Sequence, residues 1–353
     1  MSSEVVIVGS GLMTPVGLST QETAASTRSR TARLTSIDWR DSRFQPFTVG
    51  EVPADGIPPL QPELEKLPLT YREKRMLCLA DPAMKEALQK LPKTAKPISA
   101  LVGLPELHTT IPLKGPDFLA RLAGQTGAAL DLANSVAFSH GRASALEALS
   151  EACDRLSQDK AEFVLVGGVD CQVDLDVLGI LDAQKRVRNS ANPDGFAPGE
   201  GAGFLLLTTS QIAQKHSLNV LAKVIANGTA KEEGHIYSDK PYKGEGLAAA
   251  FENLFSNTPD IPPIGCVYAS FNGEHYWAKE FGVAMARNQK RFVEGHQMEH
   301  PAECFGDLGS AHGAVMLGLA AAGLKRARQN TATLLYASSD LGDRNVTLLT
   351  AGT

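Results

Sequence analysis

The fold is decided by two stretches of sequence, Val164-Leu-Val-Gly-Gly168 and the later run Gly195-Phe-Ala-Pro-Gly-Glu-Gly-Ala-Gly203. The first predicts a buried strand that ends in two glycines. The second predicts a crowded turn, in which glycines allow close backbone approach and positive φ. Within that turn we expect Glu200 to accept hydrogen bonds from buried loops, a structural role, with support of a neighbouring active site as the alternative.

Outward from these stretches, buried strands alternate with amphipathic helices in both halves of the chain. The β-branched run at residues 4–8 predicts a strand ending in a tight loop at Gly9-Ser10-Gly11. Pro15 argues against a dinucleotide-binding reading of that loop. Alternating strands and helices imply an α/β fold with βαβ crossovers and internal duplication. The predicted helices cover 71–90, 115–124, 142–156, 244–256 and 310–326, and the strands cover 98–103, 163–168, 204–207, 222–226, 265–269 and 333–337.

Charge and cysteine content exclude several classes of protein. The net charge of −5 over 353 residues disfavours nucleic acid and anionic membranes as partners. The one basic cluster, Arg72, Lys74 and Arg75, is interpreted as a solvated helix start. Five scattered cysteines predict neither disulfides nor a metal site and fit a cytoplasmic protein, and we expect no cofactor. Residues 1–17 resemble neither a signal peptide nor a membrane span.

Taken in order, the motifs resemble those of the β-ketoacyl synthases. That family has a strand ending in Gly-Gly followed by a GF-x-x-GEGAG segment, and the opening VVIVGSGLMTPVG is similar to its first strand and Gly-x-x-Thr-Pro-x-Gly loop. The resemblance implies a thiolase-like fold, with two duplicated βαβαβαββ halves in a layered αβαβα arrangement. The halves would be residues 1–207 and 208–353, forming one compact unit.

The resemblance also locates the residues that condensation requires, and this chain has other residue types there. Family enzymes use a cysteine thiolate at a helix N-terminus and two histidines. The nucleophile position falls on Phe138, or on Ser139 after a one-residue shift, and the histidine positions fall on Ser270 and Asp307. An ionised carboxylate at Asp307 would repel the oxyanion that the histidine stabilises. The family's gating loop corresponds to 338–343, where its aromatic residues are missing.

Other candidates for chemistry have structural interpretations beside the functional ones. Ser139 beside His140 could be a nucleophile, but a helix N-cap is the favoured reading. His275 is expected on the surface or at a helix start. Cys304 is expected in the core and His312 on a packed helix face, with a catalytic or ligand role as the weaker reading of each.

Two functions from different classes follow. The first is a non-catalytic pseudoenzyme that acts through protein–protein contacts, as chain-length-factor subunits do beside an active synthase. The alternative is a divergent acyltransferase, similar to a 3-oxoacyl-ACP synthase, that uses acyl-CoA or acyl-ACP.

The resemblance also bears on partners. The segments FNGEHYWAKEFG (271–282) and ECFGDLGSAHGA (303–314) are similar to condensing-enzyme-like proteins of type VI secretion clusters, which implies an accessory or adaptor role. We expect a homodimer formed through a sheet edge near the Gly-Gly strand. An active synthase subunit or a secretion effector is the alternative partner.

Overall fold

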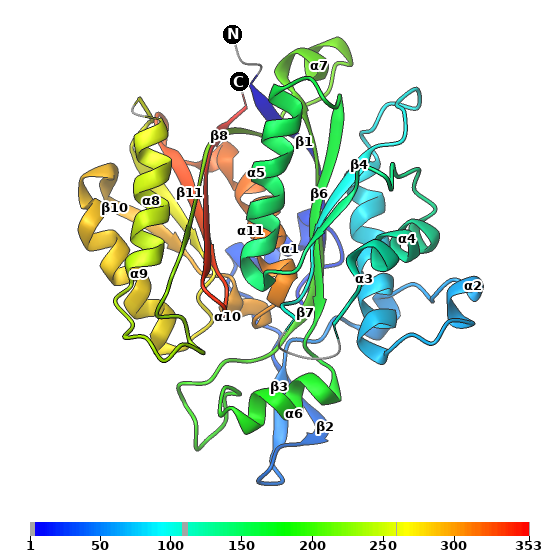
Figure 1. Ribbon diagram of the computed structural model, residues 1–353, viewed down its shortest axis with the longest axis vertical. Helices are drawn as coiled ribbons and strands as arrows, with labels where there is room; N and C mark the ends of the chain where they lie inside the picture. The colour runs from blue at the N-terminus through cyan, green and yellow to red at the C-terminus, as the bar shows by residue number, and fades with distance from the viewer. Residues whose placement is uncertain (1–3, 108–111, 259, 353) are drawn as a thin grey trace.

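The computed structural model describes residues 4–107, 112–258 and 260–352, and its main feature is a ten-stranded mixed sheet wrapped around two helices (Figure 1). The strand order is β10-β9-β11-β12-β8-β1-β7-β6-β4-β5. Outward from the middle, the first half runs β1, β7, β6, β4, β5 and the second half runs β8, β12, β11, β9, β10, so the two halves have the same topology. The strands of this sheet are β1 (Val5–Met13), β4 (Ser99–Gly103), β5 (Val136–Phe138), β6 (Phe163–Cys171), β7 (Glu200–Thr209), β8 (Ala222–Lys231), β9 (Ile264–Ala269), β10 (Phe292–Glu299), β11 (Ala332–Ser338) and β12 (Asp343–Ala351).

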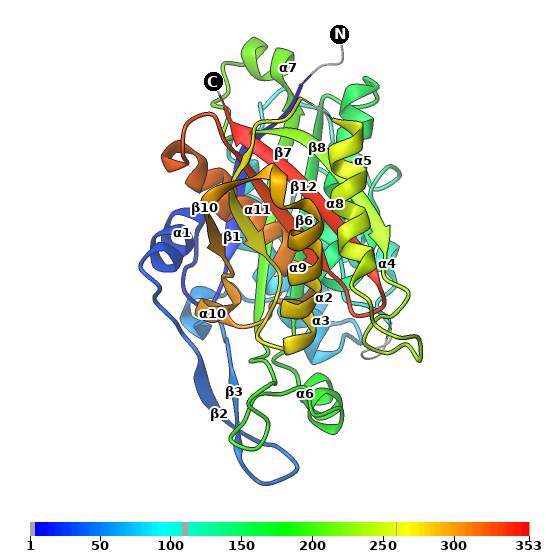
Figure 2. The ribbon, with the colours of Figure 1, turned by 90° about the vertical axis from the view of Figure 1, so that its left-hand side faces the viewer.

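The helices form three layers around the two halves of the sheet. In the centre α5 packs against β4 and β6 while α11 packs against β7 and β11, and both contribute to one apolar cluster (Figures 1 and 2). Outside, α3 and α4 cover the first half, whereas α8 and α9 cover the second. The thiolase-like layering is therefore confirmed. The helices are α1 (Thr20–Arg28), α2 (Pro62–Glu65), α3 (Tyr71–Leu88), α4 (Gly115–Thr126), α5 (Ser144–Ser157), α6 (Leu175–Ala183), α7 (Ser210–Lys215), α8 (Glu245–Asn257), α9 (His275–Asn288), α10 (Ala302–Phe305) and α11 (His312–Gly323).

The first strand does not end at its glycines, so the predicted tight loop at Gly9-Ser10-Gly11 is wrong. β1 continues to Met13 and pairs with β7 along its length. A Cβ atom on Gly11 would lie 1.9 Å from the carbonyl oxygen of Ala83, and one on Gly9 would lie 2.3 Å from that of Ala87. These glycines let α3 approach β1 closely. In the sequence, glycines required for helix packing cannot be told apart from glycines that form a turn.

The GEGAG segment is likewise part of a strand rather than a turn, because β7 begins at Glu200. None of its glycines has positive φ, so that part of the prediction is wrong. Close approach is confirmed, since a Cβ on Gly203 would lie 2.9 Å from the backbone of Ala314 in α11. The glycine pattern therefore reports how tightly the central helix lies on the sheet.

In the basic cluster at the start of α3, Arg72 is buried and Arg75 is partly buried, which contradicts the solvated interpretation for these two residues. Arg72 bonds Asp170 of β6 at 2.7 Å, and Arg75 bonds both carboxylate oxygens of Glu200 at 2.9 and 2.6 Å. The burial is possible because carboxylates from the neighbouring strands neutralise the guanidinium groups. Glu200 also accepts the backbone N–H of Val52 at 2.9 Å, so its predicted structural role is confirmed.

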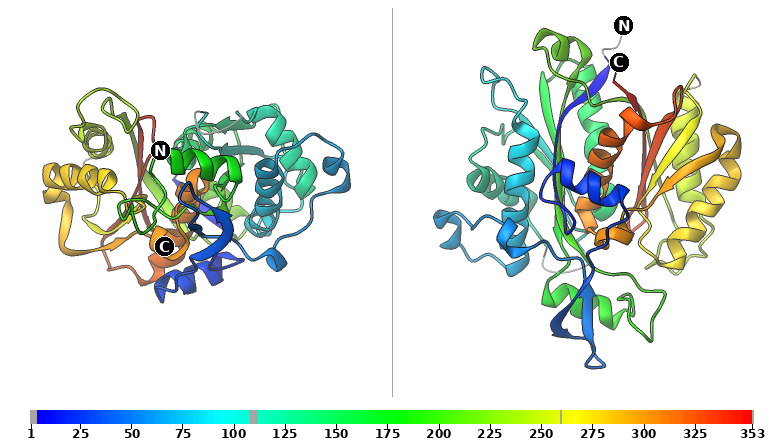
Figure 3. Two further views of the ribbon diagram at one scale, coloured as in Figure 1. Left: turned by 90° about the horizontal axis from the view of Figure 1, so that it is seen from below. Right: turned by 180° about the vertical axis from the view of Figure 1, so that it is seen from behind.

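A hairpin of β2 (Thr35–Arg40) and β3 (Pro46–Val49) projects with α6 below the main body (Figures 1 and 3). The Gly-Gly strand β6 lies inside the large sheet, and the edge nearest to it is β5. Across the described ranges, no helix combines the length and apolar character needed to cross a membrane.

Candidate functional site

The start of α5 is where the resemblance places the nucleophile. β5 ends at Phe138, a short 3₁₀ turn covers Gly141–Ala143, and the α-helix itself begins at Ser144. The predicted N-cap role of Ser139 is therefore wrong, because the extra turn separates it from the helix. The Ser144 hydroxyl instead accepts the backbone N–H of His140 at 2.9 Å. Phe138 is partly buried against the central apolar cluster.

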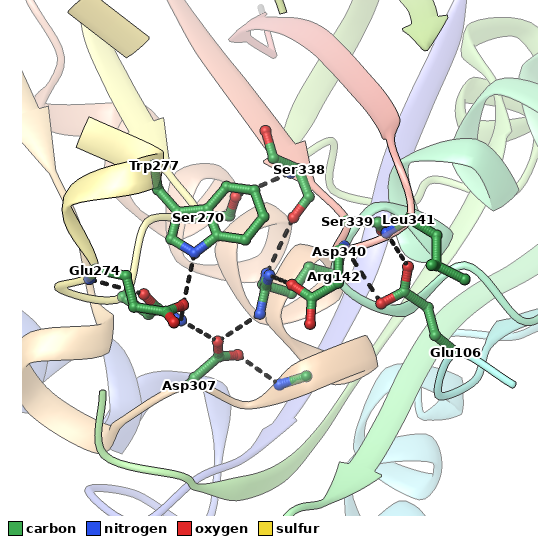
Figure 4. Close-up of polar contacts among 12 residues, drawn as sticks. Glu106, Arg142, Ser270, Glu274, Trp277, Asp307, Ser338, Ser339, Asp340 and Leu341 are labelled. Atoms are coloured by element: carbon green, nitrogen blue, oxygen red, sulfur yellow. Dashed lines mark hydrogen bonds and ion pairs between the residues drawn. The ribbon is translucent and has the colours of Figure 1, made fainter. Parts of the chain in front are cut away.

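Arg142 lies at this helix start with its guanidinium buried and bonded on every side (Figure 4). Nη1 donates to Asp307 at 2.7 Å, Nε donates to the carbonyl oxygen of Ser338 at 3.0 Å, and Nη2 bonds Asp340. Asp307 comes from the loop before α11, Ser338 is the last residue of β11, and Asp340 lies in the β11–β12 connection. Sequence reasoning missed this residue, although it directly follows the His140-Gly141 pair.

Asp307, the second histidine position, is fully buried and held as an ionised carboxylate. Besides Arg142, it accepts the Asn272 side-chain amide at 2.7 Å and the backbone N–H of Gly309 at 2.9 Å. Burial alone would raise the pKa of Asp307, but the Arg142 guanidinium, together with His312 and the hydrogen bonds from Asn272 and Gly309, lowers that pKa below its usual value. Negative charge is thus fixed at the position where the resemblance places a catalytic histidine.

A second guanidinium, Arg186, extends the network towards α9. It bonds both oxygens of Glu274 at 2.8 and 2.7 Å, and it bonds Asp340 at 2.5 Å. The indole N–H of Trp277 donates to Glu274 at 2.9 Å, while the Arg142 guanidinium carbon lies 4.6 Å from the Trp277 ring centroid. We call Arg142, Arg186, Glu274, Asp307 and Asp340 the ionic network; it is stabilised by charge pairing together with cation–π contact.

The predicted site residues divide into those that meet at this network and those that do not. Ser270 is buried, and its hydroxyl accepts the backbone N–H of Ser338 at 3.0 Å, next to the Arg142 contact (Figure 4). His275 is exposed at the start of α9 and pairs with Asp194, as expected for a surface histidine. Cys304 is buried away from the network, as expected for a core residue.

His312 lies beneath Asp307 at the start of α11 and is fully buried. Burial lowers its pKa to about 4, against the opposing charge of Asp307, so the imidazole is neutral at pH 7. Its Nδ1 accepts the backbone N–H of Leu308 at 3.4 Å, a long contact within its own turn. The expectation of a packed helix face is confirmed.

The space left beside the network is small. A cavity of about 40 Å³ lies between Arg142, Asp340, Glu106 and Phe196, which is room for roughly one or two water molecules. In the described parts of the chain, no three His, Cys, Asp or Glu side chains are grouped so as to hold a metal ion. The arrangement can bind and orient charge, but no thiol reaches it.

Glu106 makes the site sensitive to pH. Its carboxylate accepts the backbone N–H groups of Leu341 at 3.0 Å and Asp340 at 3.3 Å. Burial, followed by the nearby charge of Asp340, raises the pKa of Glu106 to about 7. The folded protein therefore binds a proton more tightly than the unfolded chain, and this contribution to stability is lost as pH rises from about 4.5 to about 7.

We expect Glu106→Gln to remove that dependence, which is on the order of 3 kcal/mol. The measurement is the free energy of unfolding in urea at pH 5 and pH 7.5, for the natural chain and the variant. The difference between the two proteins should change across this interval, with the natural chain losing more stability at the higher pH. Parallel pH profiles would contradict the assignment.

Comparisons with known proteins agree with this fold. The family model "Beta-ketoacyl synthase, N-terminal domain" matches residues 120–213, which include the start of α5, the Gly-Gly strand and the GEGAG segment. The 3-oxoacyl-[acyl-carrier-protein] synthase 2 of Staphylococcus aureus is 24% identical over 207 residues, or 54% of this chain and 46% of that protein. The chain thus spans under half the length of the curated relative it matches.

Solved structures match over the whole chain. A type II polyketide acyl-carrier protein in complex with its ketosynthase gives a TM-score of 0.80 at 16% identity, and the ishigamide ketosynthase/chain length factor gives 0.80 at 14%; both alignments cover 100% of each chain. The module 6 ketosynthase of the bacillaene synthase from Bacillus subtilis gives 0.78 at 13%, covering 99% of this chain and 72% of that one. At this identity such matches establish the fold. The chain therefore has the thiolase-like fold of the ketosynthases, and over residues 120–213 it matches the N-terminal domain of the β-ketoacyl synthases.

Proposed function

We propose that this protein does not catalyse condensation and acts through contacts with another protein, as an accessory subunit. The observation that carries the proposal is the ionic network at the start of α5. A condensing enzyme keeps a reactive thiolate and an open path for an acyl chain at this place. Here Arg142 is bonded to Asp307, Asp340 and a carbonyl oxygen, and the adjoining cavity has only about 40 Å³.

The cysteines support the same proposal. All five lie outside the network: Cys78, Cys153, Cys171, Cys266 and Cys304. Burial raises the pKa of each thiol, to about 12 for Cys153 and about 11 for Cys304. A protonated, buried thiol is a poor acceptor for an acyl group.

Two kinds of partner fit the proposal. The first is a second copy of this chain meeting at the β5 edge, where Val136 and Leu132 are 37% and 45% exposed and offer apolar surface. The second is a different protein, either an active synthase subunit or, given the resemblance at 271–282 and 303–314, a secretion effector. Light scattering on the purified chain distinguishes these cases, and a monomer would count against the homodimer.

Intact-mass measurement after incubation with acyl-CoA and with acyl-ACP tests the non-catalytic reading. We expect the mass of the natural chain to stay unchanged, because no activated nucleophile lies at an acyl-sized cavity. The variants Ser139→Ala and Cys304→Ala serve as matched controls for the two remaining nucleophile candidates. A stable acyl adduct that disappears in either variant would refute the proposal and favour an acyltransferase.

A further inference from the structure

A cavity of about 230 Å³ lies on the second half of the sheet, and none of the five residues of the ionic network lines it. It exists because the two central helices cover their half-sheets unequally: α5 packs across β4, β5 and β6, whereas α11 packs on β7 and β11. The exposed face of β9 and β10 is bordered instead by α1, α10 and the end of α11 (Figures 2 and 3). Cys266 and Tyr268 of β9 and Gln297 and Glu299 of β10 form its floor.

The charges around this cavity are not balanced. Arg30 pairs with Glu303 and lies 3.7 Å from Glu299, so the two lining carboxylates already have a cationic partner. Arg28 and Arg326, which line the cavity from α1 and from the turn after α11, form no ion pair with any described residue. The unmatched charge at the rim is therefore positive.

Apart from the two carboxylates that Arg30 neutralises, the lining between the arginines is uncharged and partly apolar. Leu319 and Ala320 of α11 contribute hydrocarbon, and the thiols of Cys266 and Cys304 face the same space. Burial raises the pKa of Cys266 to about 12 and that of Cys304 to about 11, so both are neutral thiols at pH 7. Burial also raises the pKa of Tyr268, which keeps its hydroxyl as a hydrogen-bond donor.

We propose that this cavity is a binding site for a small organic anion, whose carboxylate or phosphate group pairs with Arg28 and Arg326 while a short hydrocarbon body lies on Leu319 and Ala320. Guanidinium groups bind both kinds of oxyanion by two parallel hydrogen bonds. The volume limits the ligand to a few carbon atoms, below the usual size of a cofactor site. The site is separate from the proposed partner contacts and does not depend on them.

Saturation-transfer NMR with butyrate and with butyl phosphate tests this proposal, using butylamine as a probe with the same body and opposite charge. We expect transfer to the two anions and not to the amine. The double variant Arg28→Gln/Arg326→Gln should weaken anion binding by about tenfold or more, because charge-assisted hydrogen bonds are lost. Arg43→Gln makes the same chemical change at an exposed position on the hairpin and should leave binding unchanged.

The relative binding affinities of butyrate and butyl phosphate show which oxyanion the site prefers. The proposal is overturned if neither anion shows transfer to the natural chain. It is equally overturned if the amine binds as well as the anions, or if the double variant binds them unchanged.

Discussion

Replacing Arg142 with methionine is expected to lower the free energy of unfolding by about 3–5 kcal/mol, since it strands charged partners in the interior. Asp307 and Asp340 are both buried, and each now takes a hydrogen bond from this guanidinium. Methionine has a similar length and fills the space. The loss of stability would therefore come from the unpaired charges and not from a cavity. Urea unfolding at pH 7 measures the effect.

Two further variants separate the network from a general effect of losing an arginine. Arg30→Met removes an ion pair whose side chains are 52% and 37% exposed, and it should cost under about 1 kcal/mol. The double variant Arg142→Met/Asp307→Asn should lose less stability than the sum of its single variants, because the stranded carboxylate is gone. Additive losses would mean that the two side chains are not energetically coupled.

Gly11→Ala is expected to destabilise the protein by about 3 kcal/mol, near the upper end for overpacked cores. The new methyl group would lie 1.9 Å from the Ala83 carbonyl oxygen, and backbone atoms of α3 cannot yield as a side chain can. Either the helix moves off β1 or the strand bends. Thermal and urea unfolding measure the loss.

Gly179→Ala is the matched control for that substitution. Gly179 lies in α6 and no atom lies within 4 Å of the added methyl group, so alanine should stabilise the helix by about 0.5–1 kcal/mol. If Gly11→Ala were as harmless as Gly179→Ala, the glycines of β1 would not be required for helix packing.

Apolar runs and periodicity were sufficient to predict many of the buried elements, although the nine-residue strand β12 was missed. The helices α3, α5, α8 and α11 and the strands β4, β6, β8, β9 and β11 lie where hydrophobic patterns put them. The pattern failed for β10, whose eight residues are mostly half-exposed, and for α9, which carries polar residues around a buried Trp277. Glycine was misread in β1 and β7 because close packing and turns use the same residue.

The sequence could predict which catalytic residue types are absent from the site, but not which side chains contact one another there. The resemblance pointed to Phe138, Ser270 and Asp307 as the positions where catalytic residues of the family would stand, and this assignment stays a prediction. The motifs could not identify Arg142 and Arg186, because their partners are distant in sequence. Asp307 lies 165 positions after Arg142, and Asp340 lies 154 positions after Arg186. The charge of Asp307 was a usable signal, since a carboxylate at a buried helix start requires a cationic partner.

The most direct measurement is a mass-spectrometric assay for the 3-oxoacyl product when the purified chain is given acyl-ACP and malonyl-ACP. The ionic network contains no thiol to carry the acyl group, and its donors are already bonded to Asp307 and Glu274 and so are not available to an enolate. We therefore predict no product above the level without protein. A 3-oxoacyl product that depends on the chain and disappears in Asp307→Ala would contradict this account.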